Sequence, residues 1–294
     1  MKRATSQLEA IEVMEATMTV IAMTREMGTL GKDVAQGIAD SLGLRIVHSA
    51  LIEHDLAAKM GVQESAVHRY LEGSPSLLER WKIDKNKLSE CTAEEMLKIA
   101  RDGNVIIRGW GAVSVLRHIP HVLRIRVCAP LPFRERVMME RLGHNEPSVV
   151  HREIEASDAA HARLMRGFFK INFEDPRLYH VVLNTGCVPV ETCVRTVRLL
   201  ADDPAFQETK ATSALLNDKL VEHRVRSVLG GMIDGVGTNV SSIDIGVKDG
   251  SVILTGALLH NLRWNDAEKA LRAIPGVTHV ENRVQVVNMV SSGI

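Results

Sequence analysis

The chain has 294 residues, of which 45% are hydrophobic and 24% charged, and its formal net charge is zero. This balance excludes nothing about catalysis, but it gives no reason to expect nucleic acid or a membrane surface as a partner. Aromatic residues make up only 3% of the chain, which argues against stacking platforms for single-stranded nucleic acid. At roughly 100–200 residues per domain, the length predicts two domains.

The cysteines and the N-terminal residues bear on cellular location. The four cysteines form no CxxC pair, so we expect reduced thiols in a cytoplasmic protein. The first residues show no targeting signal, and no run of 18 apolar residues predicts a transmembrane helix. A homodimer is the default expectation for an enzyme of this size.

The stretch from Thr19 to Val47 predicts a strand, a glycine-containing loop, an amphipathic helix and a second strand. This order is typical of a phosphate-binding loop, in which glycines let backbone N–H groups approach phosphates and the helix N-terminus adds a positive dipole. Lys32 stands where a lysine reaches the outer phosphates. The alternative is an ordinary glycine-rich turn of an α/β protein.

The spacing of this loop departs from the usual Gly, four residues, then Gly-Lys-Ser/Thr. Gly31 and Lys32 fit, but Glu26 occupies the position of the first glycine. Asp33 replaces the hydroxyl residue that normally contacts Mg²⁺. Its carboxylate could bind the metal directly or through water, or it could repel a phosphate.

The chain from residue 45 to 201 predicts helices alternating with short strands, whereas 61–90 reads as polar and irregular. Thr92 and Ser157 are the expected N-caps of two of the helices. Alternating strands and helices indicate a parallel sheet covered on both faces. The expected strands after Val47 are 105–107, 121–127 and 181–183, and the expected helices are 50–60, 92–101, 113–118, 132–142, 157–169 and 191–200.

The composition changes at residues 202–216, which are rich in Thr, Ser and Ala and predict a linker. Residues 217–289 then predict a small α+β domain in the order helix, strand, strand, helix, strand. Ile243, Ile245 and Val247 alternate with polar residues, and Asp249-Gly250 is a strong hairpin signal.

Four blocks in the first part carry a family resemblance: TREMGTLGKDVA, VIIRGWGA, RVCAPLPFRERV and FFKINFEDPRLYHVVLNTG. Together they resemble the cytidylate-kinase-like family of phosphate-loop nucleoside monophosphate kinases, over residues 17–201. The resemblance implies a three-layer α/β kinase core with a parallel sheet. It also implies ATP, Mg²⁺ and transfer of a phosphoryl group to a CMP-like nucleoside monophosphate or a related small acceptor.

The resemblance also implies roles for individual residues. Lys32 would act on the transferring phosphoryl group together with the lid-side arginines Arg134, Arg136 and Arg166. Asp33 would bind Mg²⁺. The remaining implied contacts are the donor phosphates on Gly28, Thr29, Leu30, Gly31, Lys32 and Asp33, and the acceptor on His48, Arg108 and Asp158.

Several of these positions admit a second interpretation. Arg134, Arg136 and Arg141 could lie on a solvated, mixed-charge helix face. His48 could be a strand-end histidine with a structural hydrogen bond. Departures from the family pattern at Glu26, Asp33, Trp110 and His48 leave a second function open, that of a nucleotide-binding sensor without turnover.

Residues 217–289 resemble a BON domain. The hairpin IDIGVKDGSVILTG and the segment PGVTHVENRV carry this resemblance. It implies that the C-terminal part binds a membrane, a lipid, a small ligand or a protein partner.

Overall fold

The computed structural model describes residues 18–71, 83–109, 111–143, 146–233, 243–258 and 264–286. Trp110, one of the departures from the family pattern, lies outside the described residues.

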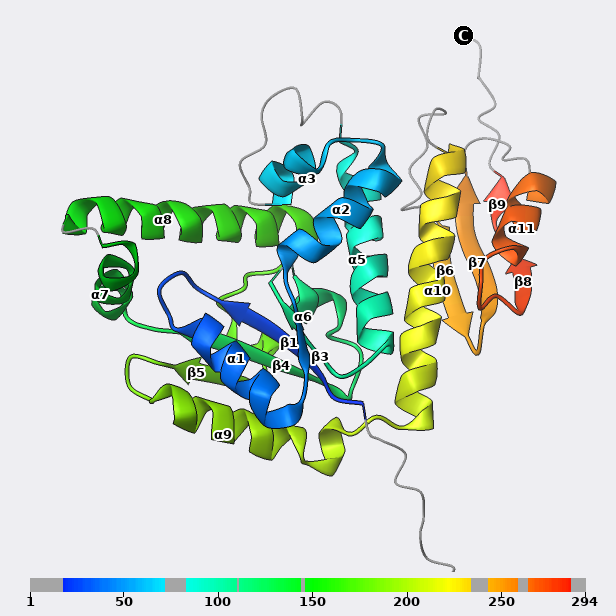
Figure 1. The fold of residues 1–294 in the computed structure, drawn as a ribbon. Helices are drawn as coiled ribbons and strands as arrows, with labels where there is room; N and C mark the ends of the chain where they lie inside the picture. Colours follow the sequence, from blue (N-terminus) through cyan, green and yellow to red (C-terminus); the bar gives the residue numbers. More distant parts are fainter. Residues whose placement is uncertain are drawn as a thin grey trace, which may run out of the picture.

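A five-stranded parallel sheet forms the centre of the larger part (Figure 1). The strand order is β2-β3-β1-β4-β5, so β1 has neighbours on both sides. Residues Val20 to Met23 of β1 are at most 1% exposed, because helices cover both faces of the sheet. The strands are β1 (Val20–Arg25), β2 (Arg45–Val47), β3 (Val105–Arg108), β4 (Val122–Cys128) and β5 (Val181–Asn184).

Alternate residues of β1 enter two hydrophobic cores. Ile21 and Met23 pack with α1 (Gly31–Leu42) and α9 (Val190–Ala201), whereas Val20 and Ala22 belong to the core on the opposite face. This arrangement confirms the three-layer α/β core that the sequence predicts. The opposite core includes residues of α2 (Ser49–Met60), α3 (Glu64–Leu71), α5 (Lys85–Arg101), α6 (Ala112–Val115) and α8 (Pro147–Leu164).

Beyond the carboxyl end of β4 the chain forms α7 (Leu131–Leu142) and then the long α8, which continues into a π-helix, η1 (Met165–Phe169). The short 3-10 helix η2 (Pro176–Leu178) leads into β5. Phe169 of η1 packs on the β3–α6 turn, since a Cβ added to Gly111 would lie 2.4 Å from its ring.

The C-terminal part has the predicted order of helix, strand, strand, helix and strand, with one further short strand. β6 and β7 form an antiparallel hairpin, whose turn residues Asp249 and Gly250 both have positive φ. β8 and β9 pair with β7 in parallel. The elements are α10 (Lys210–Ile233), β6 (Ile243–Lys248), β7 (Ser251–Leu258), α11 (Trp264–Arg272), β8 (His279–Asn282) and β9 (Gln285–Val286).

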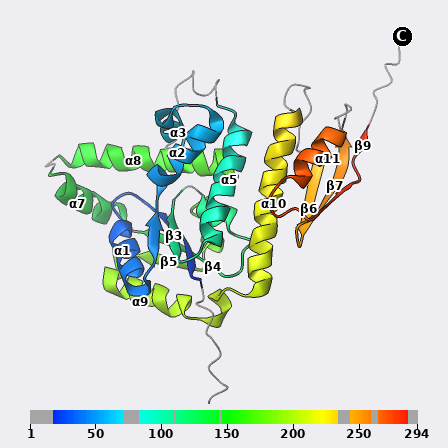
Figure 2. The ribbon, with the colours of Figure 1, turned by 45° about the vertical axis from the view of Figure 1, so that its right-hand side comes forward.

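The range predicted as a linker, 202–216, is mostly helical. It contains the 3-10 helix η3 (Pro204–Phe206) and the first turns of α10, where the Thr209 hydroxyl accepts the N–H of Thr212 at 3.2 Å. Leu216 and Leu220 of α10 enter the core of the larger part, whereas Val221 belongs to the core of the C-terminal part. α10 therefore packs between α5 and the small sheet (Figure 2).

Helix starts also differ from the prediction. Part of the range 61–90 is helical, because it contains α3 and the start of α5, whose N-cap Asp84 accepts the N–H of Asn86 at 2.8 Å. Thr92 therefore lies inside α5, where its hydroxyl donates to the carbonyl of Leu88 at 2.7 Å. Likewise α8 begins at Pro147 and not at Ser157.

Candidate active site

The loop between β1 and α1 is fixed by hydrogen bonds and by unusual backbone angles. Gly28 has φ +78° and Leu30 has φ +53°, the left-handed region in which non-glycine residues are uncommon. The buried Thr29 hydroxyl donates to the Glu26 carbonyl at 2.8 Å, and the Thr185 hydroxyl donates to the Thr29 carbonyl at 2.6 Å. The β5–α9 turn thus holds the loop at the carboxyl edge of the sheet.

Arg134 clamps the same loop from α7. Its Nε donates to the Met27 carbonyl at 2.6 Å, and its two Nη atoms donate to the two Asp158 oxygens at 2.8 and 2.7 Å. Gly28 lies against the Arg134 backbone, since an added Cβ would be 2.7 Å from the Arg134 oxygen. The structure therefore brings Arg134 and Asp158 together, with the arginine only 5% exposed.

Glu26, which stands at the position of the first loop glycine, is neutralised by two arginines. Its carboxylate pairs with Arg126 and lies 3.7 Å from Arg134. The Arg126 guanidinium also lies over the Phe173 ring and donates to the Glu174 carbonyl. These contacts show how a carboxylate is accommodated beside the β1–α1 loop.

Four cations from four elements gather next to the loop: Arg25 at the end of β1, Lys32 at the start of α1, Arg108 at the end of β3 and Arg141 from α7. Burial, followed by repulsion from Arg108 and Arg141, lowers the pKa of Arg25 to about 10. Repulsion from Arg25 is the largest cause of the lowered pKa of Lys32, followed by burial and then by Arg108 and Arg141. We refer to Arg25, Lys32, Arg108 and Arg141 as the cation cluster.

Arg25 was missed by the sequence reasoning, although it lies inside the block TREMGTLGKDVA. The available signal was its position as the last residue of β1, immediately before the loop. Its side chain packs against Gly31, where an added Cβ would meet the Arg25 Cβ at 2.8 Å. A glycine at that position therefore leaves room for the arginine.

Asp33 is the acidic counterpart of the cation cluster. Its carboxylate accepts a hydrogen bond from Arg141 at 2.6 Å, and it opposes the lowering of the pKa of Arg25 and Lys32. Mg²⁺ is typically bound by one or two carboxylates together with water and substrate phosphates. Asp33, half exposed in the first turn of α1, fits such a role, whereas the Thr29 hydroxyl is buried and already bonded to Glu26.

Three predicted residues stand apart from this arrangement. His48 is exposed at the N-cap position of α2, directly after β2, and makes no side-chain cap bond. Arg136 is exposed on α7, with its guanidinium 5.2 Å from the centre of the Phe133 ring. Arg166 is exposed on η1. Within the described residues neither Arg136 nor Arg166 contacts the loop through a hydrogen bond or ion pair.

Comparison with models of protein families shows the family to which the chain belongs. Residues 20–186, more than half of the chain, match the model of the Cytidylate kinase-like family. The chain belongs to the cytidylate kinase-like family. Membership of this family supports nucleotide kinase activity in general.

Individual relatives match a similar share of this cytidylate kinase-like chain. It is 29% identical over 178 residues to the cytidylate kinase of Pyrobaculum aerophilum, across 60% of this chain and 90% of that protein. It is 25% identical over 181 residues to the cytidylate kinase of Pyrobaculum islandicum, with the same two coverages. An uncharacterised protein from Eubacterium ventriosum has a similar solved structure, with a TM-score of 0.49 and 17% identity over 63% of this chain and 99% of that one.

Two further observations concern the described residues only. None of their helices is both long and apolar enough to cross a membrane. They also hold no group of three or more His, Cys, Asp or Glu side chains arranged to bind a metal ion, so a metal bound at Asp33 would need ligands from water and substrate.

Proposed function

We propose that the protein transfers the γ-phosphoryl group of ATP to a CMP-like nucleoside monophosphate or a related small acceptor. The observation that carries this proposal is the cation cluster beside the β1–α1 loop, at the carboxyl edge of the parallel sheet. Ligands of open α/β sheets bind outside the carboxyl ends of the strands. The mutual repulsion that lowers the pKa of Arg25 and Lys32 would be relieved by a bound polyphosphate.

The donor would bind at the loop. The amides of residues 28–31 and the N-terminus of α1 would face its phosphates, with Lys32 on the outer phosphates and Arg25 behind the loop. Phosphoryl transfer depends mainly on positioning and on neutralising charge. Mg²⁺, bound with ATP and contacting Asp33, would neutralise charge on the two outer phosphates.

The acceptor would lie along the same edge, over β3 and β2. Arg108 ends β3 and His48 follows β2, so the strand order β2-β3-β1 places them successively beside the loop. Arg108 would bind the acceptor phosphate, and His48 would be its neighbour and a candidate acid or base. We assign Arg134 and Asp158 to holding the loop. The exposed Arg136 and Arg166 would reach a phosphoryl group only after α7 and η1 move toward the loop.

A second candidate function is a nucleotide sensor without turnover. It is favoured by the Glu26 carboxylate next to the loop and by the ion pair that occupies Asp33 and Arg141. Glu26 places a carboxylate next to the loop, and Arg141 competes with Mg²⁺ for the Asp33 carboxylate. The sensor would bind Mg·ATP and release no ADP.

ADP release from Mg·ATP, measured across a panel of nucleoside monophosphates, separates the two functions. The kinase predicts turnover that rises with one acceptor and falls by roughly 10²–10³-fold in Lys32→Ala. Absence of turnover with every acceptor, in protein that binds ATP and loses this binding in Lys32→Ala, would favour the sensor.

The remaining parts of the proposal concern the whole chain. α10 to β9 would form a BON-like domain that binds a small ligand, a lipid or a protein partner. A cytoplasmic location is supported by the free thiols of Cys91, Cys128, Cys187 and Cys193. A homodimer is the default for an enzyme of this size.

A further inference from the structure

Glu94, in the middle of α5, connects α2 and α10, which lie on different sides of α5. Its Oε2 accepts a hydrogen bond from Lys59 of α2 at 3.1 Å, and its Oε1 accepts one from Arg224 of α10 at 3.1 Å. Lys98, one turn along α5, lies 2.9 Å from Oε1. The side chains of Glu94 and Arg224 are only 14% and 17% exposed, so these pairs are largely shielded from solvent.

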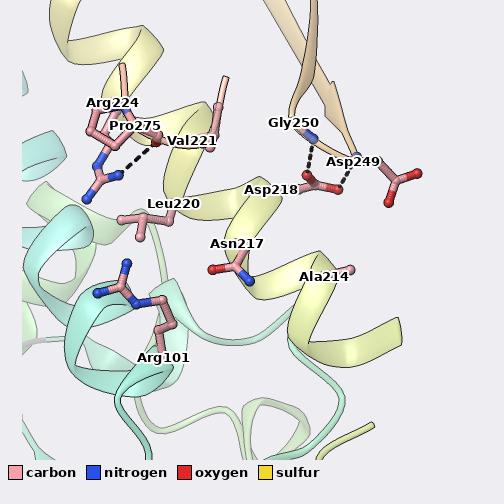
Figure 3. A pocket seen from close by; sticks show the side chains of 11 residues that line it. Arg101, Ala214, Asn217, Asp218, Leu220, Val221, Arg224, Asp249, Gly250 and Pro275 are labelled. Atoms are coloured by element: carbon pink, nitrogen blue, oxygen red, sulfur yellow. Dashed lines mark hydrogen bonds between the residues drawn. The ribbon is translucent and has the colours of Figure 1, made fainter. Parts of the chain in front are cut away.

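Arg224 continues this connection into the C-terminal part. Its Nη1 donates to the carbonyl of Pro275, in the turn between α11 and β8, at 3.0 Å (Figure 3). Asp218, on the same helix, accepts the N–H groups of Asp249 and Gly250 at 2.9 and 3.0 Å. The Asp249-Gly250 turn and the Pro275 turn are thus both bonded to α10, and the Pro275 turn connects through Arg224 and Glu94 to Lys59.

A cavity of about 440 Å³ lies next to these bonds, lined by α5, α10 and the two turns (Figure 3). Of its charged lining residues, Asp218 and Arg224 form the hydrogen bonds described above. The cavity borders apolar packing, because Leu220 and Val221 of α10 enter the cores of the two parts. The bonds of Arg224 add a polar link between the Pro275 turn and α5.

The charge state of Glu94 makes the link costly to break. Burial alone would raise the pKa of this carboxyl, but hydrogen bonds from Lys98 and Lys59 outweigh it and lower the pKa to about 2. Glu94 therefore stays ionised at neutral pH. A largely buried charge that loses a partner is strongly unfavourable, so Glu94 holds Arg224 against α5. Lys59 is held against the same helix by Glu94 and also by the neighbouring Glu95, which accepts a second hydrogen bond from its Nζ.

The position of α2 connects this link to the proposed reaction. α2 begins at the carboxyl end of β2, at the edge of the sheet where Arg108 ends the neighbouring strand. We propose that Glu94 is a positioning residue, which together with Arg224 holds the acceptor-side helix α2 in register with the C-terminal part. This inference rests on the proposed function, because it requires the acceptor to bind beside α2.

The test compares Arg224→Met with Arg226→Met. Arg226 lies on the same helix and also pairs with acidic residues, Glu222 at 3.3 Å and Glu90 at 3.8 Å, but it contacts neither Glu94 nor Pro275. Both variants remove one charge, and only Arg224→Met interrupts the link. We expect Arg224→Met to raise the KM for the acceptor by roughly 5–10-fold while kcat and the KM for ATP stay within about twofold.

Hydrogen exchange of the α2 amides gives a readout that does not need turnover. Exchange in residues 53–60 should be faster in Arg224→Met than in wild type and unchanged in Arg226→Met. Glu94→Gln is the second variant, and it should match Arg224→Met in both measurements. If wild type releases no ADP with any acceptor, the proposed function fails but the exchange result still tests the link.

Two results would overturn the inference. If Arg224→Met and Arg226→Met changed the acceptor KM and the α2 exchange equally, the bonds of Arg224 would only stabilise the fold and would not position α2. Unchanged α2 exchange in both Arg224→Met and Glu94→Gln would show that α2 is held by its other contacts.

Discussion

Arg134 and Asp158 form a two-pronged ion pair, with Nη–Oδ distances of 2.8 and 2.7 Å, while the Arg134 Nε holds the Met27 carbonyl. One guanidinium thereby connects α7, α8 and the β1–α1 loop. We conclude that the shape of the loop depends on this pair.

Replacing Arg134 by Met should therefore destabilise the protein. Asp158 and the Met27 carbonyl would each lose a partner, but the Asp158 side chain is 36% exposed and can be solvated, so the cost should be roughly 2 kcal/mol, below the value for a fully buried pair. Urea unfolding measures the loss. Arg136→Met is the matched control, because that exposed side chain lies over the Phe133 ring and forms no bond with the loop within the described residues. Its replacement should lower the free energy of unfolding by less than about 1 kcal/mol. Equal losses of unfolding free energy in the two variants would contradict the conclusion that Arg134 holds the loop.

Gly28→Ala should cost more than the left-handed backbone alone explains. The new Cβ would lie 2.7 Å from the Arg134 oxygen, at φ +78°. Gly43→Ala has a similar φ of +65° and nothing within 4 Å, so it reports the backbone strain of about 1 kcal/mol by itself. The expected result is a larger drop in unfolding free energy, and weaker ATP binding, for Gly28→Ala only. Similar behaviour of the two variants would show that the loop shifts freely.

The sequence predicts the central sheet well, because five apolar runs separated by helical patterns leave few other arrangements. It also predicts the loop, because Gly28, Gly31 and Lys32 stand close together in the sequence between a strand pattern and a helix pattern. Long-range pairs are not visible in this way: the contact of Arg141 with Asp33 joins residues 108 positions apart. The cation cluster could be predicted only in part: the position of Arg25 at the end of the first strand places it next to the loop, but nothing local shows that Arg108 and Arg141 come together with it.

Helix boundaries show a second limit. Asp84 caps α5, but Thr92 offers an equally good local signal eight residues later and lies inside the helix. The choice is made by Leu88, which is fully buried in the core and extends the apolar face of α5. A similar effect makes 210–216 helical, because Leu216 packs into the core on that side.

Asp33→Asn tests the assignment of the metal. If Asp33 contacts Mg²⁺, the Mg²⁺ concentration for half-maximal ADP release should rise roughly 10-fold or more, within the 10–100-fold range typical of altered metal-site residues. Arg141→Met frees the carboxylate from its ion pair and should leave this concentration unchanged or lower it. A rise with Arg141→Met, or none with Asp33→Asn, would assign Asp33 to holding Arg141 alone.

His161 predicts a pH-dependent loss of stability. Its Nε2 is buried without a hydrogen-bond partner among the described residues, and burial lowers the pKa of the ring to about 4, against the attraction of Asp158. Between pH 6.5 and 4 the unfolded chain binds a proton that the folded ring does not, so the free energy of unfolding falls as pH falls. His161→Gln should flatten this part of the profile by up to about 3 kcal/mol. Parallel profiles for wild type and variant would refute the assignment.

The most direct test of the central claim follows the phosphoryl group itself. Protein is incubated with ATP labelled in its γ-phosphate, Mg²⁺ and CMP, alongside the Arg25→Met and Lys32→Ala variants. We predict label in the nucleoside diphosphate formed from CMP or a related acceptor, with transfer slower by roughly 10²-fold or more in both variants. Label that stays in ATP with every nucleoside monophosphate, in protein shown to bind ATP, would contradict the account.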